Sequence, residues 1–517
     1  MNFSLTDHQR LLSALQTHRS FTHPTQSIER VETHISSILL TGEYAYKIKK
    51  PVDFGFLDFS TLAKRKHYCE EELRLNTRTA PDIYLSVVPI NGSITHPHIN
   101  GNGPTIEYAI KMRQFDQAHL LGCLLQQGKL SKPIIDELAE VISSFHDHAS
   151  VCPNNSNFGN EAAIYTPVAQ NIRITLSLLK DPQERLRLDR LKNWSNHEHT
   201  KLKPVFRQRK AEGFIRECHG DLHLNNIARI EGKITLFDSI EFSEPLRWID
   251  IMSDLAFISM DLIDHAASPL AWRLINHYLE HSGDYQGLEV LRFYQVYRAM
   301  VRAKIACLRL NQSNLSTSQT EEIIQQYRGY AELAETLTVP QKPLLILTCG
   351  LSGSGKSWLS QQLLEALPAC RIRSDVERKR VFSSFLSDKQ RLYSTEASAE
   401  TYQRLLRLAQ QSLRSGYTTI VDAAFLKEAQ RKPFITWAKN INCPVVTLRT
   451  HADESILRQR ILKRHAESGN VSDATPSVLE SQIAKYEPPN RLENLIEIDT
   501  GHPVDLDPVI HMLRTFV

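Results

Sequence analysis

Residues 344–357 read LLILTCGLSGSGKS, and this stretch decides the fold of the second part of the chain. Its first six residues form a continuous apolar run, which is typical of a strand buried in a parallel sheet. The run leads into the full G-x-x-x-x-G-K-[ST] pattern and then a helical stretch, which is the setting that a phosphate-binding loop requires. The glycines allow backbone N–H groups to turn inward as an anion nest at a helix N-terminus. We therefore predict an α/β P-loop NTPase domain with a parallel sheet.

The same loop supplies the predicted nucleotide contacts, which are Gly350, Ser352, Gly353, Ser354, Gly355, Lys356 and Ser357. Lys356 would place a point charge beside the β- and γ-phosphates, and Ser357 would supply an oxygen ligand for magnesium. ATP and Mg²⁺ are therefore the expected cofactors.

Two carboxylates follow the loop at the ends of predicted strands. Asp375 comes after the strand at 370–374, and Asp422 comes after the strand at 418–421. Open α/β sheets bind ligands at the carboxyl ends of their strands, so both aspartates are expected at the site.

Three arginines complete this pattern. Arg378 lies one helical turn beyond Asp375, and Arg460 and Arg464 form an i,i+4 pair on a later predicted helix. This part of the chain resembles P-loop kinases of the polynucleotide kinase, zeta toxin and gluconate kinase group. The resemblance implies that Asp375 is the base for the acceptor hydroxyl and that Arg378 binds a substrate phosphate. It also implies that Asp422 is a Walker-B-like group near magnesium or the acceptor, and that Arg460 and Arg464 are lid arginines that neutralise the transferring phosphate.

A second motif lies upstream, where residues 219–226 read HGDLHLNN and Asp238 follows a short apolar strand. Phosphoryl transfer to a hydroxyl needs a base, and an amide and a carboxylate to hold magnesium. The motif resembles the catalytic loop of the aminoglycoside phosphotransferase family, which are small-molecule kinases with a protein-kinase-like fold. By that resemblance Asp221 is the catalytic base, Asn226 is a magnesium ligand, and Asp238 is the counterpart of the aspartate in D-F-G. Ser-Ile follows Asp238 in place of Phe-Gly.

The small lobe of such a kinase needs a strand lysine that reaches the α- and β-phosphates. Alternation along the strand at 43–50 places Lys47 and Lys49 on one face, and we assign the role to Lys47 with Lys49 second. One glutamate of the run at 70–72 should pair with this lysine, and the spacing to the following leucines favours Glu71. A solvated strand edge and a solvated acidic helix face are the alternatives. No G-x-G-x-x-G precedes Lys47, so the loop that covers the phosphates is unassigned.

The Pro-punctuated stretch at 338–343 is the natural linker. We predict an α+β, bilobal kinase-like domain at 1–337, with a small lobe at about 25–115 and a helical lobe at about 116–337, followed by the P-loop kinase domain at 344–517. A linker this short is no floppy tether, so the two halves are expected to touch.

The composition of the chain limits the kinds of partner that we expect. The chain has 517 residues, 41% hydrophobic and 23% charged, with a net charge of +3, so no global field demands a nucleic-acid partner. Its eight cysteines are scattered without a C-x-x-C pair, which indicates reduced thiols in a cytoplasmic protein. There is no run of 18 apolar residues, so no membrane span is expected.

Together these patterns predict a bifunctional ATP-dependent phosphotransferase that acts on hydroxyl groups of small-molecule acceptors. A nucleotide or nucleic-acid 5′-hydroxyl acceptor is an alternative for the second domain only. Two further alternatives are an active kinase domain fused to a regulatory P-loop ATPase, and a non-catalytic nucleotide-binding module fused to an active P-loop kinase.

Overall fold

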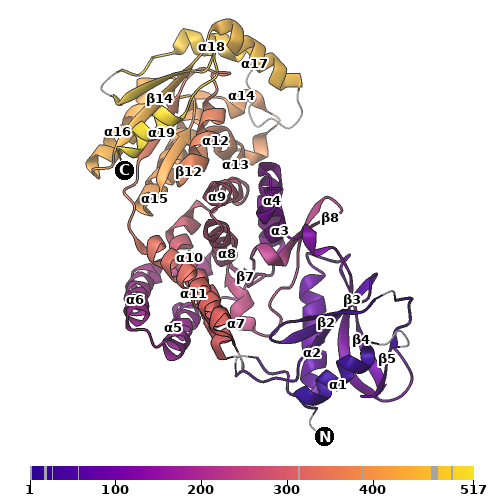
Figure 1. Cartoon of the computed structure of the whole chain (residues 1–517). Coiled ribbons are helices and arrows are strands. Elements are labelled where there is room, and N and C mark those ends of the chain that lie inside the picture. Colours follow the sequence, from indigo (N-terminus) through magenta and orange to yellow (C-terminus); the bar gives the residue numbers. More distant parts are fainter. Residues whose placement is uncertain are drawn as a thin grey trace. The chain divides into compact units, whose positions relative to one another are not determined.

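The computed structural model describes residues 3–516 except 17–19, 26, 56, 312–314, 387, 467–474 and 491–492. It divides into two compact units (Figure 1). The first unit comprises Met1–Glu137, Ser144–Gln170 and Lys203–Asp261. The second unit comprises Leu138–Ser143, Asn171–Leu202 and Leu262–Val517. The boundary predicted at 338–343 from sequence stays a prediction.

The first unit contains a six-stranded antiparallel sheet in the order β1-β2-β3-β6-β4-β5. Its strands are β1 (Glu29–Glu32), β2 (Ser36–Leu40), β3 (Tyr44–Lys49), β4 (Tyr84–Ser93), β5 (His96–Ile99) and β6 (Thr105–Arg113). Helix α2 (Leu62–Asn76) packs against β4 and β6 through buried apolar residues of both elements, among them Cys69 and Ile110. Ala45 of β3, the strand that carries the two predicted lysines, belongs to the same buried cluster.

Two short β-pairs follow in the first unit, β7 (Ile215–Glu217) with β10 (Trp248–Asp250), and β8 (Ile227–Ile230) with β9 (Lys233–Leu236). The turn between β8 and β9 is Glu231-Gly232, and both residues have positive φ, 50° and 82°. Right-handed strand twist favours such turns in two-residue hairpins. The hairpin brings the segment after β9 beside the loop at 219–226, where Phe237 N donates to Asn226 O at 3.0 Å.

The helices around these elements and in the rest of the lobe have the following bounds. They are α1 (Leu5–Leu15), α3 (Leu121–Gln126), α4 (Lys132–His148), α5 (Glu161–Leu178), α6 (Pro182–Ala211), α7 (Glu244–Arg247), α8 (Ile251–Asp264), α9 (Ser268–Ser282), α10 (Leu288–Leu308) and α11 (Thr317–Thr338). Within the described ranges, none of the helices combines the length and the apolar character needed to cross a bilayer.

The second unit contains a five-stranded parallel sheet in the order β12-β13-β11-β14-β15. Its strands are β11 (Leu345–Cys349), β12 (Ala369–Arg373), β13 (Thr418–Asp422), β14 (Val445–His451) and β15 (Leu495–Asp499). The helices are α12 (Lys356–Ala366), α13 (Ser374–Val381), α14 (Lys389–Leu392), α15 (Thr395–Arg414), α16 (Glu428–Asn440), α17 (Glu454–Ala466), α18 (Pro476–Lys485) and α19 (Asp507–Arg514). Strands β11, β12 and β13 correspond to the strands predicted from sequence at 344–349, 370–374 and 418–421.

These two architectures confirm the predicted fold class. One is an antiparallel sheet with a helical lobe, and the other is a parallel-sheet P-loop domain in which β11 leads through the glycine-rich loop into α12.

Helix α9 covers the exposed edge of the parallel sheet (Figure 1). Strand β12 is the edge strand, and the Asn276 side chain hydrogen-bonds to its backbone as a neighbouring strand would. The Asn276 amide donates to Ala369 O at 2.8 Å and its Oδ1 accepts from Arg371 N at 2.6 Å. Arg273 of the same helix pairs with Glu365 of α12 at 2.6 Å. An uncovered edge strand would leave these backbone groups unpaired.

We expect Asn276→Ala to lower the free energy of opening of β12 by about 2–4 kcal/mol, because a buried carbonyl and a buried N–H lose their partners. Hydrogen exchange of the amides at 369–373 in the full-length chain measures this. Asn276→Asp, which keeps the acceptor and loses the donor, should fall between the wild type and the alanine variant. Asn440→Ala, at an exposed position of α16, is the matched control. Unchanged exchange in Asn276→Ala would refute the edge-covering role.

Candidate active sites

Lys47 of β3 is the centre of the first candidate site. Its Nζ lies 2.7 Å from Glu72 Oε1 and 2.5 Å from Asp238 Oδ1, so that strand β3, helix α2 and the segment after β9 meet at one ammonium group. Burial by itself lowers the pKa of Lys47, but the carboxylates of Asp238 and Glu72 outweigh it and hold the pKa well above its ordinary value. Lys47 is therefore a permanent cation at this site.

The glutamate that pairs with Lys47 is Glu72, and the prediction of Glu71 is corrected. Glu71 points to another side of α2, where its carboxylate accepts from Arg74 at 2.9 Å and Arg247 at 3.3 Å. Consecutive helical residues differ by about 100° in direction, so only one of the two can face β3. Glu72 is fully buried on that side.

Sequence reasoning placed Lys49 second and missed its partner Glu241. Lys49 Nζ lies 2.7 Å from Glu72 Oε2 and also pairs with Glu241, in a completely buried cluster. Glu72 thus accepts from two lysines at once. Burial would raise the pKa of Glu72, but the two ammonium groups hold it below its ordinary value, so the carboxylate is charged. Alternation along β3, which puts both lysines on one face, was the signal available in the sequence.

The catalytic-loop residues are held by hydrogen bonds within the loop. Asn226 Nδ2 donates to Asp221 O at 2.9 Å and to Asp221 Oδ2 at 3.2 Å, so the predicted base and the predicted metal ligand lie in contact. His223 Nε2 lies 3.4 Å from the same Asp221 carboxylate. The structure therefore brings Asp221 and Asn226 together at one end of the loop.

Asp254 of α8 anchors this loop through its backbone. The two carboxylate oxygens of Asp254 accept from His219 N at 2.8 Å and from Gly220 N at 3.0 Å. His146, Cys218 and Asp254 could bring three ligand atoms within 4.8 Å of one another. Both oxygens of Asp254 already accept backbone N–H groups, so we interpret this buried cluster as structural rather than metal-binding.

Asp238 has φ of 65°, in the left-handed region that residues with a Cβ seldom adopt. Its N–H donates to the Tyr84 hydroxyl at 3.2 Å, and its carboxylate is held by Lys47. Strained backbone of this kind is concentrated where side chains must be aimed at a ligand. This outlier supports the functional assignment of Asp238 over a role as a turn residue.

The second candidate site is the loop between β11 and α12, in which Gly350 and Gly353 have no room for a Cβ. Gly353 has φ of 84°, and a Cβ there would lie 2.8 Å from Leu457 O. A Cβ on Gly350 would lie 2.4 Å from Thr450 O. The loop is therefore curled closely against β14 and α17, with α12 beginning at Lys356. A helix N-terminus behind a loop of this shape fits a phosphate group.

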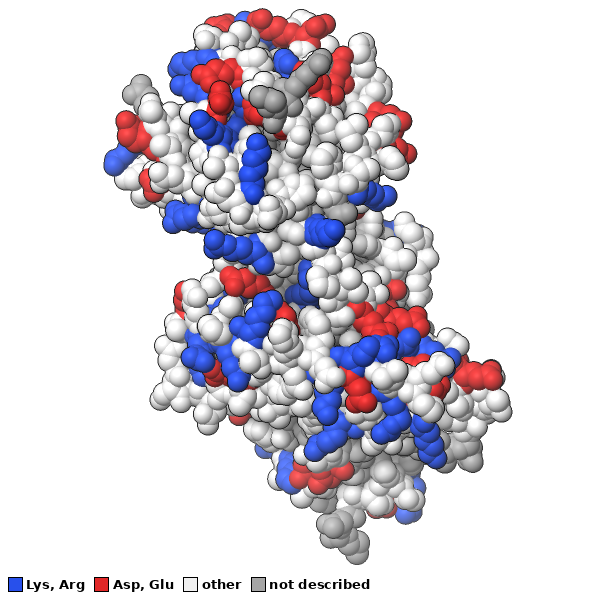
Figure 2. Space-filling view, turned by 90° about the vertical axis from the view of Figure 1, so that its left-hand side faces the viewer, with Lys and Arg blue, Asp and Glu red and all other residues white. Residues whose placement is uncertain are grey.

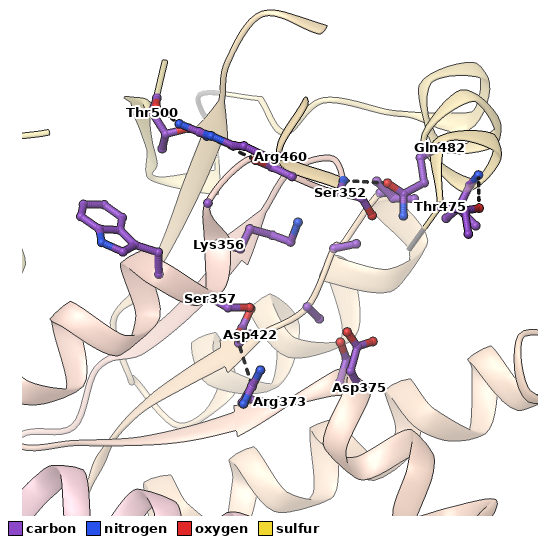
Figure 3. Close-up of a pocket in the computed structure, with 18 of the residues that line it drawn as sticks. Ser352, Lys356, Ser357, Arg373, Asp375, Asp422, Arg460, Thr475, Gln482 and Thr500 are labelled. Atoms are coloured by element: carbon purple, nitrogen blue, oxygen red, sulfur yellow. Dashed lines mark hydrogen bonds and ion pairs between the residues drawn. The ribbon is translucent and has the colours of Figure 1, made fainter. Parts of the chain in front are cut away.

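Lys356, Ser357, Asp375 and Asp422 line one cavity of about 1090 Å³ (Figure 3). Small-molecule sites usually enclose roughly 300–1,000 Å³, so this cavity has room for a nucleotide and an acceptor together. Lys356 Nζ donates to Gly350 O at 2.9 Å and Leu351 O at 2.8 Å, which keeps the ammonium at the mouth of the loop. Ser357 and Asp422 both line this cavity, and their hydroxyl and carboxylate oxygens are of the kind that binds Mg²⁺.

Arg373 and Arg378 also line this cavity. Arg378 is 7% exposed, its Nη1 donates to Leu392 O at 3.1 Å, and its guanidinium lies 5.0 Å from the centre of the Tyr393 ring. Its Nε is buried and has no hydrogen-bond partner among the described residues. Arg373, which sequence reasoning missed, lies 3.9 Å from Asp422 Oδ2.

Arg460 also lines the cavity but is tied to its wall. Its guanidinium donates to Gly353 O at 3.3 Å and to Thr500 Oγ1 at 3.1 Å, as Figure 3 shows for Thr500. The side chain of Arg464, the other predicted lid arginine, lies outside the described part. Gln482 of α18 was not predicted, and its Oε1 accepts from Ser352 N at 2.8 Å.

Parts of the chain are similar to known families and proteins. Residues 345–489 match the family model described as AAA domain. The chain is 27% identical over 484 residues to "Uncharacterized protein Rv2004c" of Mycobacterium tuberculosis (strain ATCC 25618 / H37Rv), covering 92% of this chain and 91% of the relative.

Two solved structures are each similar to part of the chain. A putative kinase from Chloroflexus aurantiacus J-10-fl is 25% identical, with 34% of this chain and 100% of that chain covered and a TM-score of 0.30. A choline/ethanolamine kinase family protein from Mesorhizobium loti is 11% identical, with 64% and 99% covered and a TM-score of 0.38. Within the chain, the region that contains the phosphate-binding loop, residues 345–489, thus matches the AAA domain family.

Proposed function

We propose that this chain is an ATP-dependent phosphotransferase with two nucleotide sites, each of which transfers a γ-phosphate to a hydroxyl group of a small-molecule acceptor. The observation that carries the proposal is the cavity of the second unit, where Lys356, Ser357, Asp375 and Asp422 line the same space. A phosphate cradle, a metal-binding oxygen pair and a further carboxylate for the acceptor are the parts that kinases of this kind require.

In the first site Lys47 would hold the α- and β-phosphates while Glu72 fixes its direction. Asp221 would accept the proton of the acceptor hydroxyl, and Asn226 and Asp238 would supply the oxygens for magnesium. Magnesium, when bound, would neutralise charge that develops on the β- and γ-phosphate oxygens. In the structure Lys47 and Asp238 are in contact, so nucleotide entry would insert a phosphate and a metal between groups that already attract each other.

In the second site the loop amides and Lys356 would bind the β- and γ-phosphates, with Ser357 and Asp422 toward the metal. Asp375 lies in the first turn of helix α13 at the end of β12 and would act as the base for the acceptor hydroxyl. Arg460, already fixed on Gly353 and Thr500, would neutralise charge on the transferring phosphate.

The unpartnered Nε of Arg378 indicates what the second acceptor carries. A buried donor without a partner is costly, and an anionic group in the cavity would satisfy it. We therefore propose an acceptor with a phosphate or carboxylate besides its hydroxyl. On the face drawn in Figure 2, Lys and Arg are interspersed with Asp and Glu, which favours a small anion over a long polyanion on this face.

We expect Glu72→Gln to weaken ATP binding at the first site by about tenfold or more, because Lys47 loses a charged hydrogen-bond partner. Both this variant and Glu71→Gln, the matched control one residue away, are made in a Lys356→Ala background so that calorimetry reports the first site alone. Glu71→Gln should bind as its background does. Equal losses in the two variants would contradict the assignment of Glu72.

We expect Asp221→Asn and Lys356→Ala to remove two separable ATP-consuming activities of the full-length chain. Loss of the base should slow the first activity by about 10²- to 10⁴-fold, and loss of the loop lysine should slow the second by about 100-fold or more. Radiolabelled γ-phosphate and a metabolite extract provide the measurement, because the extract offers many hydroxyl acceptors at once and the label marks those that react.

The pattern of loss also separates the alternatives. If only one variant abolishes labelling, one site is regulatory, and if Lys356→Ala removes only acceptor-independent hydrolysis, the P-loop site is an ATPase switch. Labelled oligonucleotides would identify a nucleic-acid 5′-hydroxyl kinase. Full activity after both substitutions would refute the proposal.

A further inference from the structure

Arg373 of β12 stands between two carboxylates in the second unit. Its Nη1 lies 3.3 Å from Glu280 Oε2 of α9, and its Nε lies 3.9 Å from Asp422 Oδ2 of β13 (Figure 3 shows the second pair). Glu280 is the closer partner, and it lies outside the residues that line the cavity. The Arg373 guanidinium is therefore hydrogen-bonded to Glu280 and lies beyond hydrogen-bond distance of Asp422.

Glu280 is itself firmly placed. Its Oε1 lies 2.7 Å from Arg371 Nη2, and the Glu280 side chain is 9% exposed. Burial would raise the pKa of Glu280, but Arg371 and Arg373 outweigh it and hold the pKa below its ordinary value, so the group is a carboxylate when it meets Arg373. The helix that carries it is fixed on β12 by Asn276.

Asp422 needs its charge for magnesium. A guanidinium in full contact with its carboxylate would occupy the oxygens with N–H donors and neutralise them, because arginine and carboxylate pair in a planar, bidentate fashion. Arg373 Nε lies 3.9 Å from Asp422 Oδ2, too far for a hydrogen bond, while Arg373 Nη1 pairs with Glu280. Among the described residues, only Ser360 donates to the Asp422 carboxylate at hydrogen-bond distance, from its Oγ to Oδ2 at 3.2 Å.

We propose that Glu280 is a positioning residue for the P-loop site: it holds Arg373 away from Asp422 and so keeps the Asp422 carboxylate available to the magnesium of Mg·ATP. The inference rests on the proposed function of this site and deepens it, since a helix from before the predicted linker sets the metal affinity of the P-loop domain. Removing Glu280 lets Arg373 close on Asp422 and compete with the metal.

The test measures binding rather than turnover and uses the full-length chain. ATP is titrated by calorimetry with Mg²⁺ and with EDTA, and the component that Lys356→Ala removes is assigned to the P-loop. The measured quantity is the magnesium-dependent gain, which is the ratio of the ATP affinity of this component with Mg²⁺ to its ATP affinity with EDTA. Glu280→Gln should reduce the gain about 10-fold or more, which is the effect typical of residues that position a metal ligand without binding the metal themselves.

Arg373→Met separates this role from a structural one. In the double variant Glu280→Gln/Arg373→Met no guanidinium remains to close on Asp422, so the magnesium-dependent gain should return toward the wild-type value. The single variant Arg373→Met, which keeps Glu280 paired with Arg371, should retain the gain, and it tests the proposal even if Glu280→Gln folds poorly.

Three results would overturn the inference. They are an unchanged gain in Glu280→Gln, a double variant as weak as Glu280→Gln alone, and a loss of the gain in Arg373→Met. If the Lys356→Ala variant binds ATP as the wild-type chain does, the P-loop site does not bind ATP. That result would refute the proposed function of the P-loop site and this inference with it.

Discussion

The edge of the parallel sheet is the constraint on which the second unit depends. Strand β12 has a neighbouring strand on one side only, and the backbone groups on its other side must be paired or exposed to water. Asn276 satisfies two of them, and Arg273 and Glu280 add ion pairs to Glu365 and Arg371 on either side. Helix α9 is therefore part of the structural framework of the P-loop domain, although it precedes the predicted linker by more than fifty residues.

The first site depends on a different constraint, the burial of charge. Two lysines and two glutamates, Lys47, Lys49, Glu72 and Glu241, are all at least nine-tenths buried. Taking such charges out of water costs several kcal/mol per ion, and close pairing is needed to offset it. Apolar residues of similar size could fill the space at less cost, so the cluster is better explained by what it does for Lys47. Because Lys47 pairs with both Glu72 and Asp238, the position of its ammonium group is fixed.

Sequence predicted the parts of both sites that are local. The loop at 350–357 and the motif at 219–226 carry their chemistry within eight residues each, so spacing alone constrains their geometry. The helix has glutamates in three successive directions. The spacing to Leu73 and Leu75 favours Glu71, but Leu75 also follows Glu72 by one helical turn, so the leucines do not separate the two glutamates. The buried face is in fact formed by Arg65, Cys69, Glu72, Leu75 and Asn76, a helical period in which only two members are apolar. Arg373 and Glu280 could not have been paired from sequence, because 93 positions separate them and neither belongs to a motif.

The register between α9 and β12 explains why one helix can both cover the edge and reach the site. Asn276 and Glu280 are separated by four residues, so they lie on one face of α9 about 6 Å apart along its axis. Arg371 and Arg373 are separated by two residues of strand, which is about 6.6 Å, and their side chains point to the same side of the sheet. The two spacings nearly match. Once the Asn276 amide has bonded to the backbone at 369 and 371, the Glu280 carboxylate must arrive beside the guanidinium groups at the carboxyl end of the strand, where the ligands of parallel sheets bind. The packing of α9 on β12 therefore both pairs the edge of the sheet and places the Glu280 carboxylate. The position of Arg373, and through it the environment of Asp422, depends on this packing.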